Sequence, residues 1–174
     1  YGIWDKPAAD AITGSRATHL TKQEIIYEDV PANSEFEVRV TTNVPVDWTS
    51  RRGWYLDLVS PDGAEGERVV AAPILRAGRV IFPTLIPSSD PCGFGGTSWL
   101  MELEAISGSR LVQSPLDITE DGEINEGDFV TVEIDGEKIA VPVSGVRSRE
   151  GIIRTPAVVS AGSIEYKIAS GTSG

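Results

Sequence analysis

The sequence predicts an all-β fold, a partial β-propeller made of the terminal blades of a larger ring. Three observations predict it: apolar and polar residues alternate along most segments, Gly and Pro separate these segments, and one aromatic pattern recurs from Trp54 to Trp99. Alternation with a period of two gives a strand one packed and one solvated face. No segment sustains the 3.6-residue period of a helix, so we expect at most a turn or two, near residues 7–12.

The alternating segments give the expected strands in chain order. They are residues 36–42, 54–59, 129–134 and 138–143, with longer apolar runs at 69–75 and 80–87. The 18 Gly and 11 Pro residues lie largely between such runs, where turns need their backbone conformations. Asp135-Gly136 separates the last two alternating segments, and this dipeptide predicts a tight type I′ hairpin.

Two short segments share one pattern of aromatic, apolar, apolar, acidic and Leu residues. They are Trp54-Tyr55-Leu56-Asp57-Leu58 and Trp99-Leu100-Met101-Glu102-Leu103. A weaker echo relates residues 72–78 to residues 155–162. A repeat of roughly 40 to 50 residues with several short strands is typical of a propeller blade; chance similarity of two strands is the alternative. We expect Trp4, Trp54 and Trp99 in the core between blades and Trp48 in a loop.

Composition places the chain among folded, acidic domains. The 174 residues include 15 Lys and Arg against 26 Asp and Glu, a formal net charge of −11, and 40% of them are hydrophobic. This hydrophobic content fills one core, so we expect a single domain over residues 1–174. The charge argues against nucleic-acid binding, which needs clustered Lys and Arg. Neither apolar run approaches the roughly 20 residues of a membrane-spanning helix.

A calcium loop is predicted at residues 117–128, a window with six acidic residues and no Lys or Arg. Oxygen donors stand at alternate positions of twelve, and Gly122 occupies the sixth, where calcium loops turn sharply. The expected ligands are Asp117, Thr119, Asp121, Glu123 through its carbonyl oxygen, Asn125 and Asp128.

Two of these ligands, Thr119 and the short Asp128, depart from the usual donors and predict a modest calcium affinity. Ile124 is expected to anchor the loop to the fold as an apolar plug. Mg²⁺ is disfavoured because it demands tighter octahedral geometry. The alternative is a solvated acidic turn without a metal.

No catalytic residue is predicted. His19, the only histidine, has no nucleophile motif near it. Asp57 and Glu102 have the residue types of a paired-carboxylate site, but strand alternation explains them more simply as polar or hydrogen-bonding residues of the repeated strands. Cys92 is the only cysteine, so it can form neither an internal disulfide nor a four-ligand metal site.

Several segments resemble one protein family, in the same order along the chain. They are residues 1–5, 53–58, 66–70, 79–87, 90–92, 95–103, 151–156 and 166–171. Together they cover most of the chain and resemble the C-terminal β-propeller region of the type IV pilus-associated PilY1 (PilC) family. The resemblance implies a piece of a large secreted bacterial protein, located at the outer-membrane surface or on the pilus.

The same resemblance implies a function in binding and assembly, not an enzyme. Members of the family support pilus extension against retraction and attachment to surfaces or host cells. The implied partners are pilus subunits, the remaining blades of the chain's own parent, and a surface or host receptor. By the same analogy Cys92 pairs with a cysteine outside this chain, and a free buried thiol is the equal alternative.

Two other functions stay open at this point. Residues 99–108 resemble the tryptophan-docking blade pattern of quinoprotein dehydrogenases, whose propellers bind pyrroloquinoline quinone. A quinoprotein-like enzyme predicts a polar pocket with converging acids and a bound quinone. The remaining alternative is a purely structural propeller fragment whose parent carries the binding surface elsewhere.

Overall fold

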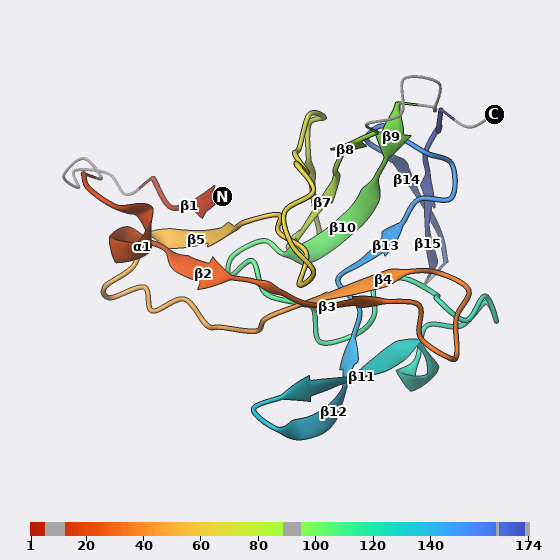
Figure 1. Ribbon diagram of the computed structural model, residues 1–174, viewed down its shortest axis with the longest axis horizontal. Coiled ribbons are helices and arrows are strands. Elements are labelled where there is room, and N and C mark those ends of the chain that lie inside the picture. Colours follow the sequence, from red (N-terminus) through yellow and green to blue (C-terminus); the bar gives the residue numbers. More distant parts are fainter. Residues whose placement is uncertain (6–12, 89–94, 163, 173–174) are drawn as a thin grey trace.

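The computed structural model describes residues 1–5, 13–88, 95–162 and 164–172 (Figure 1). The predicted helical turn at residues 7–12 and Cys92 lie outside the described residues. The all-β prediction is confirmed: strands dominate the described part of the chain. Its helical structure is confined to α1 (Arg16–His19) and the single 3-10 turn η1 (Glu126–Asp128). Neither is long enough to cross a membrane.

A six-stranded antiparallel sheet forms the centre of the molecule. Its strand order is β3-β4-β13-β10-β7-β6, and the bounds are β3 (Ile25–Asp29), β4 (Val38–Thr41), β13 (Gly145–Arg147), β10 (Trp99–Glu104), β7 (Arg79–Pro83) and β6 (Ile74–Arg76). The two halves of this sheet come from distant parts of the chain. The three-residue strand β13 joins them, because it pairs with β4 on one side and with β10 on the other.

Four smaller sheets surround the central one. A three-stranded sheet has the order β1-β5-β2, with β1 (Gly2–Ile3), β5 (Gly53–Leu56) and β2 (Thr21–Gln23). The others are two-stranded: β8 (Ile86–Pro87) with β9 (Gly96–Thr97), β11 (Phe129–Ile134) with β12 (Glu137–Pro142), and β14 (Ala157–Ala161) with β15 (Ile164–Ile168). In Figure 1 the β11–β12 hairpin projects from the molecule, away from β14 and β15.

The β11–β12 hairpin confirms the predicted turn. Asp135 and Gly136 have φ values of +55° and +83°, and positive φ at both central residues is what a type I′ turn requires. The turn therefore sets the register in which Val130 pairs with Val141 and Val132 with Ile139.

Two groups of buried apolar residues form the core. One joins β4, β11, β12 and the loop before β11: Val38, Val40, Ile118, Val130, Val132, Val141 and Val143. The other consists of Trp54, Phe82, Ile86, Trp99, Met101 and Leu103. Trp54 and Trp99 are both buried, as predicted, and the two repeated segments therefore contribute to the same packed cluster.

The repeats do not form two equivalent four-stranded blades. The first repeated segment lies in β5 of the three-stranded sheet, and the second lies in β10, inside the six-stranded sheet. The weaker echo is better preserved, since its two members each supply the first strand of a hairpin, β6 in β6–β7 and β14 in β14–β15.

Trp4 differs from its prediction, because its side chain is 45% exposed. It directly follows β1, a two-residue strand at the edge of its sheet in the described part of the chain. The Trp4 ring instead meets the ring of Trp48 edge to face, with 6.0 Å between centroids.

Candidate functional site

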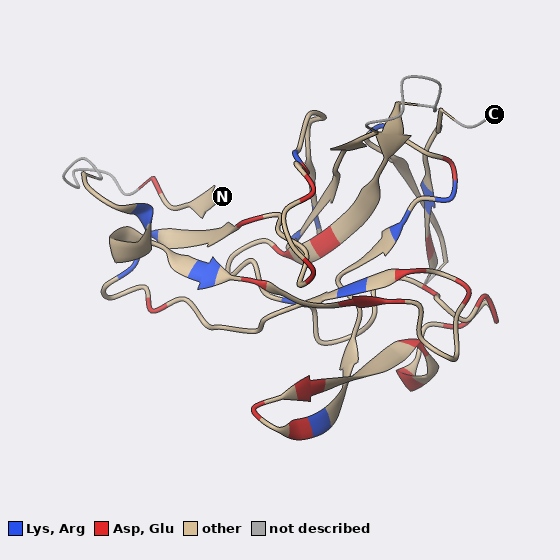
Figure 2. Cartoon of the chain, viewed as in Figure 1, with Lys and Arg blue, Asp and Glu red and all other residues tan. Residues whose placement is uncertain are grey.

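The acidic loop turns where the sequence predicts. Gly122 has a φ of +85°, and its N–H donates to Oδ2 of Asp117 over 2.9 Å. The first and sixth positions of the loop are therefore linked across the bend. Figure 2 shows acidic residues along this loop and along the adjoining β11–β12 hairpin.

Asp128, the last residue of the loop, is a fully buried carboxylate. Its Oδ1 accepts the N–H of Ile118 over 2.8 Å, and its Oδ2 accepts the N–H of Asn125 over 3.0 Å. The Thr119 hydroxyl lies between Asp117 and Asp128, at 3.2 Å and 3.3 Å from their carboxylate oxygens. Three of the six predicted ligands thus lie together.

The other predicted ligands make separate local contacts. Asp121 accepts the N–H of Glu123 over 2.8 Å, and the Asn125 side chain accepts the N–H of Gly127 over 2.6 Å. Ile124, the predicted apolar plug, is 46% exposed and lines a pocket with Phe36 and Leu116. Within the described ranges, no three His, Cys, Asp or Glu side chains are close enough to hold a metal ion. Among the described residues, the three side-chain carboxylates of the predicted set, Asp117, Asp121 and Asp128, therefore do not gather at one point.

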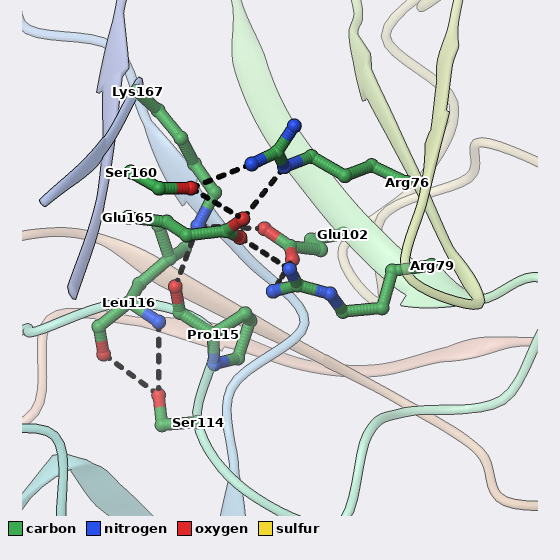
Figure 3. Close-up of polar contacts among 9 residues, drawn as sticks. All are labelled: Arg76, Arg79, Glu102, Ser114, Pro115, Leu116, Ser160, Glu165 and Lys167. Carbon is green, nitrogen blue, oxygen red and sulfur yellow. Dashed lines mark hydrogen bonds and ion pairs between the residues drawn. The ribbon is translucent and has the colours of Figure 1, made fainter. Parts of the chain in front are cut away.

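A cluster of ion pairs, not predicted from the sequence, joins the β14–β15 hairpin to the central sheet (Figure 3). Glu165 of β15 accepts from Arg76 over 2.6 Å and also from Arg79. These two guanidinium groups lower the pKa of Glu165 to about 2. Arg79 also donates to the fully buried Glu102 over 2.6 Å. Lys167 Nζ lies 2.8 Å from Glu102 and donates to the carbonyl oxygen of Pro115 over 2.7 Å.

A second group of buried charges is centred on Arg39 of β4, in the central sheet. The Arg39 side chain is fully buried, pairs with Glu28 over 2.8 Å and Glu67 over 2.7 Å, and stacks 3.9 Å from the ring centroid of Trp99. Burial raises the pKa of Glu28, and the hydrogen bond from Arg39 opposes that rise. Sequence analysis missed this group because its three charged members lie on β3, β4 and a long connection, with no motif to relate them.

An apolar groove lies between β5, β7 and the connection that follows β5. It encloses about 540 Å³, and its wall includes Trp54, Leu58, Val69, Leu75 and Phe82. Two carboxylates also border it: Asp57, which pairs with Arg16 over 2.7 Å, and Glu67, which pairs with Arg39.

The residues weighed for catalysis have structural partners. His19 Nε2 lies 2.7 Å from the carbonyl oxygen of Thr13. Asp57 and Glu102 pair with different cations, Arg16 for the former and Arg79 for the latter. Each carboxylate thus serves as an ion-pair partner, which agrees with the prediction of hydrogen-bonding residues in the repeated strands.

Comparisons with known proteins relate the chain to pilus factors. No family model matches it. It is 41% identical over 110 residues to a type IV pilus biogenesis factor PilY1 homolog of Xylella fastidiosa, across 62% of this chain. It is 28% identical over 138 residues to the type IV pilus biogenesis factor PilY1 of Pseudomonas aeruginosa, across 72% of this chain. The matches cover only 7% and 12% of these two relatives.

A solved structure extends the relation to the whole fold. The C-terminal domain of Pseudomonas aeruginosa PilY1 superposes with a TM-score of 0.71 at 19% sequence identity. The superposition covers 98% of this chain and 36% of the solved chain. The described architecture thus matches part of that all-β propeller domain.

Proposed function

The chain is homologous to the C-terminal region of the type IV pilus biogenesis factor PilY1, and we propose that it acts by protein binding in pilus biogenesis. The observation that carries this proposal is the 41% identity to a relative named as such a factor. The relatives are named as biogenesis factors and not as enzymes, which favours binding over catalysis.

In this proposal the chain lies at the bacterial cell surface, linked to the pilus. There it takes part in the control of pilus extension against retraction and in attachment to surfaces. Its partners are pilus subunits and the remaining part of its own parent, and a host or surface receptor is the target of attachment.

The apolar groove is the surface that best supports binding to a pilus subunit. It is concave and large enough for one or two apolar side chains of a partner. Leu75 on its rim is 74% exposed, and exposed apolar surface of this kind marks interaction sites.

The test deletes the gene that encodes the parent protein in a piliated bacterium and complements the deletion with wild-type or variant genes. Deletion of the gene is expected to abolish surface pili, and the wild-type gene is expected to restore them. Leu75→Glu should restore fewer pili, because it places a charge at the apolar rim of the groove. Val112→Glu is the matched control, since it adds the same charge at a residue that is 91% exposed and does not border the groove. Full piliation in the deletion strain would refute the proposed function.

We also propose that the acidic loop binds Ca²⁺, with Asp117, Thr119, Asp121, Glu123, Asn125 and Asp128 as ligands. The twelve-residue spacing, the bend at Gly122 and the bond from its N–H to Asp117 support the proposal. Six acidic side chains in one loop repel one another, and a cation relieves that repulsion. Because the carboxylates of Asp117, Asp121 and Asp128 do not gather at one point, binding is expected to rearrange the loop.

Calorimetric titration of the chelator-treated protein tests this site. One site with a Kd of roughly 0.1 to 1 mM is expected, and calcium at ten times the Kd should stabilise the fold by about 1.4 kcal/mol. Asp121→Ala should abolish the binding heat, whereas Glu133→Ala, on β11 outside the loop, should retain it. Absence of heat and of any shift in Tm at millimolar calcium would leave the loop as a solvated turn.

A further inference from the structure

The apolar groove has one buried carboxylate in its wall. Glu67 borders the groove together with Trp54, Phe82 and other apolar side chains, and its own side chain is only 1% exposed. Its Oε1 accepts from Nη1 of Arg39 over 2.7 Å, and its Oε2 accepts no hydrogen bond from the described residues. Burial of an ionised carboxylate is costly unless the group is paired and hydrogen-bonded. One oxygen of Glu67 is therefore available to a further donor.

Arg39 is shared between two carboxylates. Its Nε donates to Glu28 of β3 over 2.8 Å, while its Nη1 donates to Glu67. All three side chains are nearly excluded from water, with exposures of 0% for Arg39, 7% for Glu28 and 1% for Glu67. We call these three residues the buried triad. When both carboxylates are ionised, one positive charge faces two negative charges, so the buried triad has an excess of one negative charge.

The surroundings of the buried triad do not balance this charge. Within the described ranges, Arg39 is the one cation that forms an ion pair with either carboxylate. Burial raises the pKa of Glu28, and the nearby carboxylates of Glu37 and Glu65 raise it further, against the opposing effect of Arg39. Glu37 has its own cation, Arg147, at 3.0 Å. Figure 2 shows acidic residues on the connection between β5 and β6, where it approaches β3 and β4.

The other carboxylate of the groove already has a counter-ion. Asp57 pairs with Arg16 over 2.7 Å, and both side chains are partly exposed, so water and salt screen this pair. The buried triad lies away from water, where a charge acts more strongly because the surrounding dielectric constant is lower. Glu67 therefore dominates the electrostatic field in the groove.

A group that fits this groove needs an apolar body and a positive charge. The rim is apolar, with Leu75 74% exposed and Val69 45% exposed. A lysine or arginine side chain meets both needs, because its methylene stem covers apolar surface while its head group is charged. A carboxylate in the groove would be repelled, and a neutral apolar side chain would leave the charge of the buried triad unbalanced.

We propose that the groove binds a lysine or arginine side chain of a pilus subunit, with the methylene stem against the apolar wall and the cation at Glu67. This inference rests on the proposed function, which assigns the groove to a pilus subunit, and adds the chemistry by which the groove selects its partner. A charge-assisted hydrogen bond to Oε2 of Glu67 completes the bonding of that carboxylate. Leu75→Glu remains disruptive in this arrangement, because a carboxylate at the rim holds the cation away from Glu67.

Three probes that share one apolar body test this selection: hexylammonium, 1-hexanol and hexanoate. Each is titrated into the purified full-length parent protein at pH 8, and tryptophan fluorescence is followed because Trp54 lies in the groove wall. Hexylammonium should bind roughly tenfold more tightly than 1-hexanol, because it alone makes a charge-assisted hydrogen bond to Glu67. Hexanoate should bind more weakly than 1-hexanol.

Two substitutions in the buried triad test the origin of the preference. Glu67→Gln removes the charge from the wall, keeps the side-chain shape and leaves Arg39 paired with Glu28, so the preference for hexylammonium should fall to about twofold or less. Glu28 is not among the residues that line the groove, but Glu28→Gln also neutralises the buried triad and should lower the preference. Glu133→Gln removes an exposed carboxylate on β11 and should retain the full preference. Thermal unfolding checks that each variant is folded, and either triad variant suffices.

Equal affinities for hexylammonium and 1-hexanol would overturn the inference, because the buried triad would then be neutral through a bound proton. A preference that survives in both triad variants, or that Glu133→Gln also abolishes, would overturn it in favour of attraction by net charge. No response to any probe would overturn it by showing that another part of the parent fills the groove.

Complementation of the deletion strain separates this inference from the proposed function. Glu67→Gln should restore fewer pili than Glu133→Gln, because the groove has lost its charge for the partner. If Leu75→Glu impairs piliation while Glu67→Gln restores it fully, the inference about the cation fails and the proposed function stands.

Discussion

At Gly108 a side chain would collide with the core. The residue has a φ of +69°, and a Cβ atom there would lie 2.1 Å from Cδ2 of Trp54. Gly108→Ala is therefore expected to lower the free energy of unfolding by about 2–4 kcal/mol, from overpacking and backbone strain together. Urea unfolding of the two proteins measures the difference.

Gly78→Ala is the matched control for this substitution. Gly78 has a similar φ of +76°, but nothing lies within 4 Å of the added Cβ atom. The control should cost only about 1 kcal/mol, the strain of the left-handed backbone. Equal losses in the two variants would show that the collision with Trp54 contributes nothing.

Glu165→Gln tests the ion pairs that hold the hairpin, and it should lower stability at pH 7 by about 1 kcal/mol, because the carboxylate is partly exposed and screened. The folded pKa of about 2 lies below the ordinary value of 4.5. The ionised group therefore stabilises the fold above about pH 4.5, and this contribution is lost as the pH falls from 4.5 to 2. Urea unfolding at pH 7 and pH 3 should show a smaller difference between the proteins at pH 3. A difference that grows at pH 3 would contradict the assignment.

At the scale of elements, Asp128 holds the acidic loop in place directly before β11, through hydrogen bonds to the backbone of Ile118 and Asn125. Both carboxylate oxygens of Asp128 accept backbone N–H groups, and in Asp128→Asn one of them becomes an NH₂ group that cannot accept. The variant should therefore lower the free energy of unfolding in the absence of calcium by about 1–3 kcal/mol. Asp121→Asn is exposed and should leave stability without calcium nearly unchanged. Thermal unfolding in a chelator distinguishes them, and equal effects would deny Asp128 its structural role.

Strand positions were predictable wherever alternation and turn chemistry agreed. The run from Phe129 to Ile134 and the turn at Asp135-Gly136 gave β11 and its hairpin, because local backbone preferences decide both. The bend at Gly122 followed from the loop spacing for the same reason. These predictions needed no knowledge of the partners of each strand.

Strand orientation was not predictable where distant charges decide it. The alternation in β15 fits either face equally well, and the choice depends on Arg76, Arg79 and Glu102, more than 60 residues earlier in the chain. The placement of the repeated segments in two different sheets likewise depends on long-range pairing. The same limit applies to Arg39, whose partners Glu28 and Glu67 share no local pattern with it.

At the scale of the whole molecule, the excess of acidic residues acts on stability as a sum. A formal charge of −11 makes the folded chain repel itself, and 0.1 M salt largely screens repulsion between exposed charges that lie more than roughly 10 Å apart. The partly buried ion pairs are screened less. Raising NaCl from about 10 to about 150 mM should therefore raise the Tm by a few degrees, since about 1 kcal/mol shifts the Tm of such a domain by a few degrees. A falling Tm in a salt series, followed by circular dichroism, would mean that attractive pairs outweigh the net repulsion.

The topology of the central sheet also determines the order in which its strands can pair during folding. Its halves, β3–β4 and β10–β7–β6, are held together by β13, so the sheet stays divided until Gly145–Arg147 is available. During synthesis, the chain must emerge as far as Arg147 before this seam can close. Pairing between such distant segments slows folding, and until then β4 and β10 each keep an open edge of the kind that recruits foreign strands. The three residues of β13 thus determine how long the nascent protein is vulnerable to aggregation.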